Sequence, residues 1–525
     1  MRVSDLLDDA VTAAGLTVFG AASVPGSIDA RTRLDPAALP PARSDDHDLV
    51  ARITALRAEF LSRGLDHVVL CGMGESSLAA EVISRTLGVE LTVLDSSDPH
   101  QVRAALDDRL ARSVVVVASR SGSTVETDSH RRAYRQAFED AGLQDVGRRF
   151  VYVTEPGSPL ATTARETGSH LFLASSAHSA FSAFGLVPSG LAGVRVDTLL
   201  DEAFPRPAPH FAAGFSIAPP APEPSAADFT DPALMLGAAL ATGALAGRDK
   251  LALASDGTGL DGLSDWIEHI VASATAGSGR GLLPVVLENP SSWGHEGPDV
   301  LSVTTGGALA AGVMPGGGIA PDLAVNGPLG AQFVVWERAA AIAGHLLGAD
   351  PSARPDAEPT RLVLDAGLPH ETPVFADGAV EVYGNTSATT LVAAVDELAR
   401  GVPPLGYLAA TAYLDRVGDA AAAGVRDALA ARVARAVTFG WGPRYLHSTG
   451  RLHKGGPATG SFLQITGAVT DDLPVPGRPY TFGELQAAQA AGDRQALQAG
   501  GRPVLRLHLT DRATGIEQLL AALGG

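Results

Sequence analysis

Short apolar runs alternate with amphipathic segments over much of the chain. "HVVLCG" stands before "SSLAAEVISRTLG", "LTVLDSS" before "PHQVRAALDDRLA", and "SVVVVASRSGST" before "VETDSHRRAYRQAFEDAG". A short continuous apolar run is typical of a buried strand, whereas apolar residues three and four positions apart indicate a helix. Buried strands that alternate with helices are typical of a parallel sheet covered by helices on both faces. The pattern therefore predicts an α/β fold.

The same alternation returns after a proline-rich segment that begins at Phe204. "KLALASDGTG" leads into "LSDWIEHIVASATAG", and "LGAQFVVWERAAAIAGHLLG" is predicted to be one long helix. In the last part of the chain we expect a hairpin formed by "RLVLDAG" and "AVEVYG", followed by helices and late strands such as "SFLQIT". The predicted organisation is an N-terminal helical segment and three α/β regions, at residues 1–60, 61–205, 228–355 and 356–525.

Composition narrows the possible partners and compartments. The chain has 525 residues and a formal net charge of −19, which disfavours nucleic acid and anionic membranes as partners. Its one cysteine, Cys71, cannot form an intrachain disulfide. The N-terminus lacks the apolar stretch of a signal peptide, and no apolar run reaches membrane-spanning length. We therefore expect a cytoplasmic protein, and no motif calls for a metal or a cofactor.

Two neighbouring predicted strand ends are rich in glycine and hydroxyl groups. The first, in "CGMGESS", contains Gly72, Gly74, Ser76 and Ser77. The second, in "ASRSGSTVET", contains Ser119, Arg120, Ser121, Gly122, Ser123, Thr124 and Thr127. Ligands of parallel sheets bind at the carboxyl ends of the strands, where hydroxyls and free helix amides can surround a phosphate. The alternative is a Ser/Thr-rich turn that only caps a helix.

Other phosphate-binding loops fit this sequence less well. A Walker loop needs a Gly-Lys-Ser/Thr run, which the chain lacks. A dinucleotide fingerprint needs a third glycine after "GMG", where Ser77 stands instead.

The two turns together resemble the paired motifs of the SIS (sugar isomerase) fold in the phosphoglucose isomerase family. "FSAFGLVPSGLAG", "DWIEHIVASATAGSGRGLLPV" and "GPLGAQFVVWERA" add to the resemblance. The long segment "GPRYLHSTGRLHKGGPATGSFLQIT" is similar to the bacterial branch whose isomerase region also occurs fused to transaldolase. The resemblance runs from about residue 60 to the C-terminus.

The resemblance implies a fold, a ligand and a reaction. The fold would be two SIS-type doubly wound parallel-sheet domains, each with three αβα layers, plus a C-terminal α/β extension, usually in a homodimer. The ligand would be a hexose 6-phosphate. The reaction would interconvert an aldose and a ketose through an enediolate, with a carboxylate moving the proton between C1 and C2 and an arginine stabilising the developing charge.

The sequence departs from the family at the residues that carry this chemistry. Ala177 stands where the family has its arginine, and His178 where it has an aromatic residue. Ser273 stands in place of the catalytic carboxylate, and Gly277 in place of a lysine. Loss of a general base alone removes about 10²–10⁴-fold of rate. Ordinary glucose-6-phosphate isomerisation is therefore doubtful for this chain.

The departure at Glu75 replaces a family glycine and leaves three interpretations open. In the first, the substitution has no functional effect because it lies on a surface turn. Alternatively, the carboxylate is a relocated acid–base group. In the third interpretation, it selects against a phosphate ligand or attracts a cation such as Arg120. The residual candidates for acid–base chemistry are His178, His453 and Lys454, the last two in "LHSTGRLHKGG", which we expect to be a glycine-rich strand and loop. His447, in the same segment, is a candidate for the cleft wall, with a subunit contact as the alternative.

Three functions remain open on the sequence alone. The first is sugar-phosphate isomerisation within the family. The second is a repurposed paralogue with different chemistry or an unphosphorylated substrate such as a polyol. The third is an inactive SIS protein that binds or senses a sugar phosphate.

Overall fold

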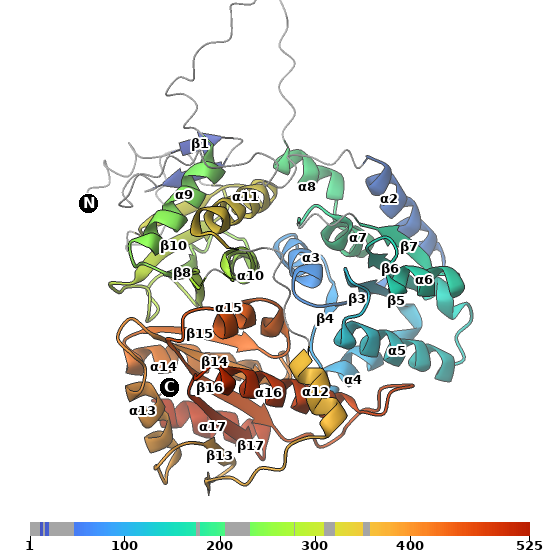
Figure 1. Ribbon diagram of the computed structural model, residues 1–525. Helices are drawn as coiled ribbons and strands as arrows, with labels where there is room; N and C mark the ends of the chain where they lie inside the picture. The colour runs from blue at the N-terminus through green and yellow to red at the C-terminus, as the bar shows by residue number, and fades with distance from the viewer. Residues whose placement is uncertain are drawn as a thin grey trace, which may run out of the picture.

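The structure is a computed structural model that describes residues 11–13, 16–19, 47–174, 179–204, 231–277, 279–308, 321–349 and 358–524. Its strands form three sheets, and the α/β fold class expected from the sequence is confirmed. Figure 1 shows the three sheets grouped around helices α3 (Glu75–Thr86), α10 (Leu263–Thr275) and α15 (Thr449–Gly455), which lie near the centre of the molecule. Helix α10 contacts both of the others, so the centre is where the three parts of the chain meet.

The first sheet is entirely parallel, in the order β4-β3-β5-β6-β7. Its strands are β3 (His67–Gly72), β4 (Thr92–Leu94), β5 (Ser113–Ala118), β6 (Phe150–Thr154) and β7 (His170–Leu173). Alternate side chains of a strand point to opposite faces. Val68 and Leu70 therefore join one apolar core, while Val69 and Cys71 join another. Both faces are apolar because helices cover both.

The helices around this sheet divide into two layers. The layer on the side of Val68 consists of α2 (His47–Ser62), α3 and α7 (Ala183–Ala192), and the opposite layer of α4 (Pro99–Asp107), α5 (Val125–Asp140) and α6 (Pro159–Glu166). This is the doubly wound, three-layer arrangement expected from the sequence. The long helix expected at residues 329–348 is also confirmed, as α11 (Leu329–Leu347).

The second sheet has the order β1-β2-β11-β10-β8-β9, and its last four strands are parallel. Strands β8 (Lys250–Ser255), β9 (Leu283–Leu287), β10 (Val300–Gly306) and β11 (Leu323–Asn326) are accompanied by α8 (Val196–Ala203), α9 (Pro232–Leu245), α10 and α11. Leu251 and Leu253 extend the same core that contains Val68, so the first two sheets share one apolar interior. The other face, with Ala252 and Ala254, packs against residues of the third sheet.

Two short strands of the N-terminal segment belong to the second sheet, although the sequence pattern predicts only helix for this segment. Strands β1 (Val11–Ala13) and β2 (Leu16–Phe19) pair antiparallel, and β2 pairs with β11. Strands of three and four residues are too short for their alternation to stand out from a helical pattern. The division of the chain at 61–205, 228–355 and 356–525 remains a proposal.

The third sheet has the order β12-β13-β17-β16-β14-β15 and is mixed. Its strands are β12 (Phe375–Asp377), β13 (Val380–Gly384), β14 (Tyr407–Tyr413), β15 (Ala436–Trp441), β16 (Gly460–Gly467) and β17 (Val504–Leu509). Its helices are α12 (Glu358–Ala366), α13 (Leu391–Arg400), α14 (Val425–Val433), α15, α16 (Phe482–Ala499) and α17 (Arg512–Leu523), with short 3₁₀ helices η7 (Ala420–Gly424) and η8 (Arg444–His447).

One expectation for this region is wrong. "RLVLDAG" lies in helix α12 and forms no hairpin with "AVEVYG". The hairpin is β12–β13, whose strands pair directly across the turn at Gly378. The apolar residues of "RLVLDAG" were misread because Leu362, Val363 and Leu364 form too short a run to separate helix from strand, and Val363 packs against helix α16.

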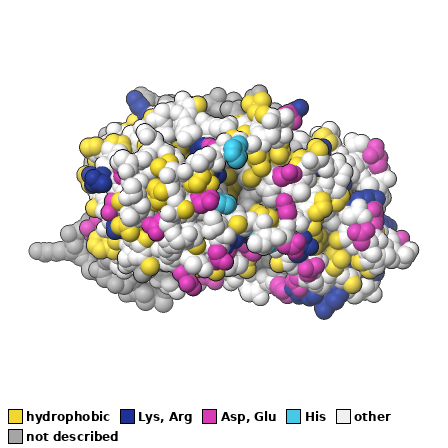
Figure 2. Space-filling model, turned by 90° about the horizontal axis from the view of Figure 1, so that it is seen from below, with side chains coloured by type: hydrophobic (Ala, Val, Ile, Leu, Met, Phe, Trp, Pro, Cys, Tyr) yellow, Lys and Arg dark blue, Asp and Glu magenta, His cyan; other side chains and the backbone are white. Residues whose placement is uncertain are grey.

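Two surface features bear on the partners. Within the described residues, no helix is long and apolar enough to cross a membrane. Figure 2 shows acidic and basic side chains intermixed on the face seen from below, and no broad basic surface is visible among the described residues there.

Candidate active site

The turn between β3 and α3 is closed in by two histidines from other parts of the chain. Gly74 has a φ of 56°, a conformation that favours glycine. A Cβ atom at Gly74 would lie 2.9 Å from Cε1 of His269 on α10 and 2.9 Å from Cβ of His447 in η8. Glycine is therefore required both by the backbone and by the close approach. The same contact brings α10 and η8 to the carboxyl end of β3.

The turn between β5 and α5 presents hydroxyls to solvent. Ser121 and Ser123 are exposed, and their Oγ atoms lie 2.9 Å apart in a hydrogen bond. Below them, buried Ser119 bonds Thr124 Oγ1 at 2.8 Å and accepts the Gly122 amide at 3.2 Å. The buried pair fixes the shape of the turn, which leaves the exposed pair available to a ligand.

Helix α5 begins without a capping hydrogen bond, unlike its neighbours on the same face of the sheet. In α4 the side chain of Asp98 accepts two amides of the first turn, and in α6 Ser158 accepts one. Thr124, which holds the same position in α5, makes no such bond because its hydroxyl is bound to Ser119. The amides at the start of a 16-residue helix are thus left to bind an anion.

The β6–α6 turn packs against the β5–α5 turn. Gly122 has a φ of 69°, and a Cβ there would lie 3.0 Å from the Leu160 amide nitrogen and 3.0 Å from Ser158 Cβ. Arg120 Nε donates to Glu155 Oε1 at 3.2 Å, so the cation of the turn is paired with a carboxylate at the end of β6. The turn can therefore not change shape independently of β6.

A buried carboxylate links the α5 turn to His447. Glu126 Oε1 accepts Gln489 Nε2 at 2.7 Å and lies 3.4 Å from His447 Nε2. Burial alone would raise the pKa of Glu126, but the hydrogen bond and positive charge of His447 outweigh it and hold that pKa below its usual value. His447 remains partly accessible. A histidine oriented by a buried carboxylate is an arrangement suited to general acid–base catalysis.

Two partly buried arginines form ion pairs that connect the C-terminal region to the first sheet and its helix α3. Arg444, at the start of the η8 helix that ends in His447, lies 2.8 Å from Glu81 and 2.9 Å from Asp95. Arg416 lies 2.8 Å from the same Glu81. The two arginines hold the pKa of Glu81 far below its usual value, against the raising effect of burial. These ion pairs set the position of η8, and with it that of His447.

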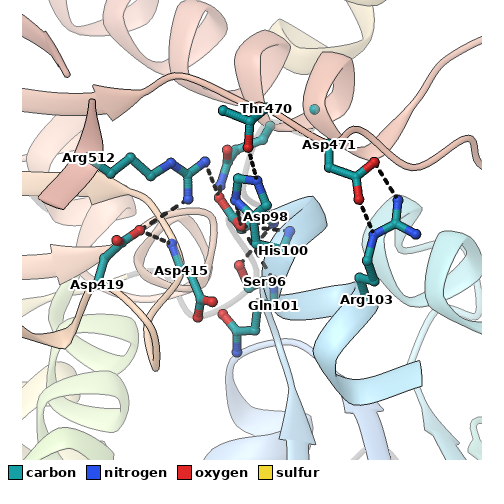
Figure 3. Close-up of polar contacts among 12 residues, drawn as sticks. Ser96, Asp98, His100, Gln101, Arg103, Asp415, Asp419, Thr470, Asp471 and Arg512 are labelled. Atoms are coloured by element: carbon teal, nitrogen blue, oxygen red, sulfur yellow. Dashed lines mark hydrogen bonds and ion pairs between the residues drawn. The ribbon is translucent and has the colours of Figure 1, made fainter. Parts of the chain in front are cut away.

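A second group of polar contacts between the first sheet and the C-terminal region lies beside these ion pairs and is drawn in Figure 3. Buried Asp98, the cap of α4, lies 2.8 Å from Arg512 of α17, and Arg512 also contacts Asp419 at 3.1 Å. His100 reaches Thr470 at 3.3 Å, and Arg103 reaches Asp471 at 3.1 Å. The edge of the first sheet is thus tied to the C-terminal region at several points, as the figure shows.

Two carboxyls of α10 have no such partners. Within the described residues, Asp265 and Glu268 form no hydrogen bond or ion pair, and they lie one helical turn apart. Asp265 is exposed, whereas Glu268 is half-buried. Desolvation, with the charge of Asp265 added, raises the pKa of Glu268 to about 8, and the charge of Arg444 opposes this only in part. Glu268 is therefore largely neutral at pH 7.

The structure brings the two predicted binding turns to one edge of the first sheet. Gly72 and Ala118 end paired strands, and a Cβ at Gly72 would lie 3.4 Å from that of Ala118. Ser77 is buried and donates to the Gly74 carbonyl, whereas Ser76 is partly exposed. Thr127 is buried on the first turn of α5. Glu75 is the first residue of α3, and its side chain, like the whole of His178, lies outside the described residues.

Two catalytic candidates, His453 and Lys454, lie on helix α15 and have partners within the protein. The segment expected as a strand and loop is instead the helices η8 and α15. His453 is buried between Tyr407 and Phe462, with Nδ1 2.9 Å from Tyr407 Oη, and burial lowers its pKa to about 3. Lys454 pairs with Asp493 at 2.7 Å. These contacts favour a structural role for both. Sequence reasoning passed over Glu126, although it lies inside "SGSTVET", and Gln489, for which no sequence signal exists.

The carboxyl edge of this parallel sheet therefore carries a hydroxyl-rich turn before an uncapped helix, and a histidine that contacts a buried carboxylate. No family model matches the chain. It is 31% identical over 233 residues to a probable glucose-6-phosphate isomerase of Haloarcula marismortui, which covers 42% of this chain and 49% of that one. It is 36% identical over 146 residues to the glucose-6-phosphate isomerase of Acaryochloris marina, which covers 25% of this chain and 27% of that one. Parts of the chain are therefore similar in sequence to glucose-6-phosphate isomerases.

The matches cover only parts of these proteins. The matched regions span about half or less of the curated relatives' length. Among solved structures, the glucose-6-phosphate isomerase of Chlamydia trachomatis aligns with a TM-score of 0.49 at 14% identity, over 70% of this chain and 90% of that one.

Proposed function

We propose that this protein binds a hexose 6-phosphate at the carboxyl edge of its first sheet and interconverts the aldose and ketose forms slowly. The observation that carries the proposal is the β5–α5 turn, where exposed Ser121 and Ser123 hydroxyls stand before an uncapped helix. The curated relatives are glucose-6-phosphate isomerases, which supports the same ligand class.

The sugar would extend from this turn toward the β3–α3 turn. Gly74 keeps that turn close to the sheet, and His447 borders it on one side. His447, oriented by Glu126, is the group best placed to take a proton from the sugar, which it does in its neutral form. An imidazole replaces the carboxylate that the family would place at Ser273, and no charged stabiliser stands at Gly277. We therefore expect turnover at least ~100-fold slower than that of ordinary glucose-6-phosphate isomerases.

The experiment compares ligands rather than rates. Calorimetry and thermal shifts are measured with glucose 6-phosphate, fructose 6-phosphate, glucose, glucitol and inorganic phosphate. We expect both hexose phosphates to bind and to raise the melting temperature, and the unphosphorylated compounds to do neither. Equal binding of glucose or glucitol would favour the repurposed paralogue. Absence of any binding would contradict the proposal.

The assembly and compartment are expectations of the same kind. We expect a homodimer, because the family resemblance implies one, and a cytoplasmic protein, because no apolar run of the sequence reaches membrane-spanning length. Light scattering at micromolar protein concentration measures the first, and a monomeric mass would contradict it.

A further inference from the structure

The unpaired carboxyls of α10 are a feature that the proposed function does not use. Other acidic side chains at the centre of the molecule are paired. Glu81 and Asp95 bind arginines, Glu126 binds His447 and Gln489, and Asp493 binds Lys454. Glu268, by contrast, forms no hydrogen bond or ion pair within the described residues and keeps partial access to solvent. A carboxyl that is neither paired nor fully exposed is available to a ligand.

The position of α10 places the residue that follows Glu268 beside the proposed sugar site. The ring of His269, the next residue, packs against Gly74 from one side, while His447 packs against it from the other. Arg444, in the same short helix as His447, is close enough to influence the titration of Glu268. Glu268 and His447 therefore belong to two elements that meet at one turn.

We propose that Glu268 is the general acid of this site and that it acts on an oxygen of the bound sugar while His447 acts on its carbon. The assignment rests on the proposed function. It also explains how turnover can persist without the carboxylate that Ser273 replaces.

The proton transfers balance with these two groups alone. In the open-chain aldose, neutral His447 takes the proton from C2 as Glu268 gives its proton to O1, so a C1–C2 double bond forms and the C1–O1 double bond becomes single. The product is a neutral enediol. The Glu268 carboxylate then takes the proton from O2, and the His447 imidazolium gives its proton to C1. The ketose forms and both groups return to their starting states.

The surroundings of Glu268 suit an acid of this kind. Two charged groups act on Glu268: Asp265 on the same helix and Arg444 in η8. Asp265 is in turn influenced by Glu81 and Arg85 on α3 and by Arg416 after β14. Burial and Asp265 favour the neutral form, which gives a pKa of about 8. The acid is then protonated at neutral pH, and its activity should fall above pH 8.

The test measures turnover and binding separately, over the pH range 6 to 9.5. The variants are Glu268→Gln and Glu268→Asp, with Glu517→Gln, an exposed glutamate of α17, as the matched control. We expect Glu268→Gln to lower kcat by about 100-fold or more and to change the Kd for glucose 6-phosphate by less than about twofold. Glu268→Asp should retain part of the activity, and its activity should still fall at alkaline pH (the alkaline limb of the pH profile). Asp265→Asn should move that limb to lower pH, because it removes a like charge.

Several outcomes would overturn the assignment. One is a Glu268→Gln protein with wild-type kcat and an unchanged pH profile. Another is loss of turnover in Glu75→Gln but not in Glu268→Gln, which would give the role to the glutamate of the β3–α3 turn. A wild-type protein that binds glucose 6-phosphate without any turnover would contradict the assignment of Glu268 as general acid, but it would leave the proposed binding site intact. A wild-type protein that binds no hexose phosphate would overturn the proposed function itself.

Discussion

The β5–α5 turn of the first sheet and the β8–α10 turn of the second have the same local design but different chemistry. Each follows a strand inside a parallel sheet, contains glycines with positive φ, and leads into a helix without a side-chain cap. In the first turn, Ser121 and Ser123 face solvent. In the second, Asp256 accepts the Thr258 amide at 2.9 Å and Asn326 Nδ2 at 2.6 Å, and Thr258 Oγ1 accepts the Gly307 amide at 2.7 Å.

The difference shows that an open helix terminus is not enough to make a phosphate site. The carboxylate of Asp256 repels an anion and uses the nearby donors internally. The hydroxyls of the first turn bind one another and can reorient toward a ligand. At the first turn the nearby carboxylates have partners of their own, Glu155 with Arg120 and Glu126 with Gln489 and His447, so the exposed hydroxyls remain available. The second turn instead begins the helix that carries Glu268.

The largest expected effect concerns the histidine beside the first turn. His447→Gln should lower kcat by about 100-fold, because the neutral amide cannot take a proton from carbon. Asp256→Asn, the matching change at the second turn, should leave kcat within about twofold of wild type. Steady-state isomerase assays on both variants measure this contrast. Equal losses of kcat in the two variants would mean that both the β5–α5 and the β8–α10 turn take part in the reaction.

The next effect compares two glycines. Gly122→Ala places a methyl group 3.0 Å from the Leu160 amide and forces the first turn to move, so the Kd for glucose 6-phosphate should rise at least ~10-fold. Gly259→Ala, in the second turn, has a φ of 90° but meets no atom within 4 Å. It should cost about 1–2 kcal/mol of stability with no change in affinity. Calorimetry and thermal unfolding separate the two, and a loss of affinity in Gly259→Ala would place ligand contacts at the second turn.

The smallest expected effect is on the way the free energy of unfolding changes with pH. The folded-state pKa of Glu268, about 8, lies above the ordinary value of 4.5, so the folded protein binds a proton that the unfolded chain releases. The stability contributed by this proton is present below pH 4.5 and is lost as pH rises through 8. Glu268→Gln should therefore be more stable than wild type at pH 8.5 by at least about 1 kcal/mol, and the gain should shrink toward pH 5.

Denaturant titrations of wild type and Glu268→Gln between about pH 5 and pH 8.5 test the sign of this stability difference. Buried His130 and His453, whose pKa values are lowered to about 4 and about 3, also titrate on unfolding. Their contribution cancels when the variant is compared with wild type. A constant difference at all pH values would show that Glu268 titrates normally.

The sequence predicts the first sheet and the positions of its two glycine- and hydroxyl-rich turns, because both depend on local signals. "VVVVASRSGST" combines an apolar strand with turn residues, and Gly74 marks a backbone position that only glycine suits. The acid–base groups were harder to predict because they depend on contacts between distant segments. Glu126 and His447 are 321 residues apart, and Glu126 and Gln489 are 363 apart. The raised pKa of Glu268 depends on burial at the junction of three sheets, which no local pattern records.

The account depends most on the claim that the β5–α5 turn holds the phosphate group, and one titration tests this directly. Calorimetry with glucose 6-phosphate is performed on wild type, on the double variant Ser121→Ala/Ser123→Ala, which removes both exposed hydroxyls of the turn, and on Ser62→Ala, which removes an exposed hydroxyl of α2. Because hydrogen bonds to a charged group contribute about 1.5–3 kcal/mol each, the double variant should bind at least ~10-fold more weakly, while Ser62→Ala binds as wild type does. Wild-type affinity in a correctly folded double variant would contradict the account.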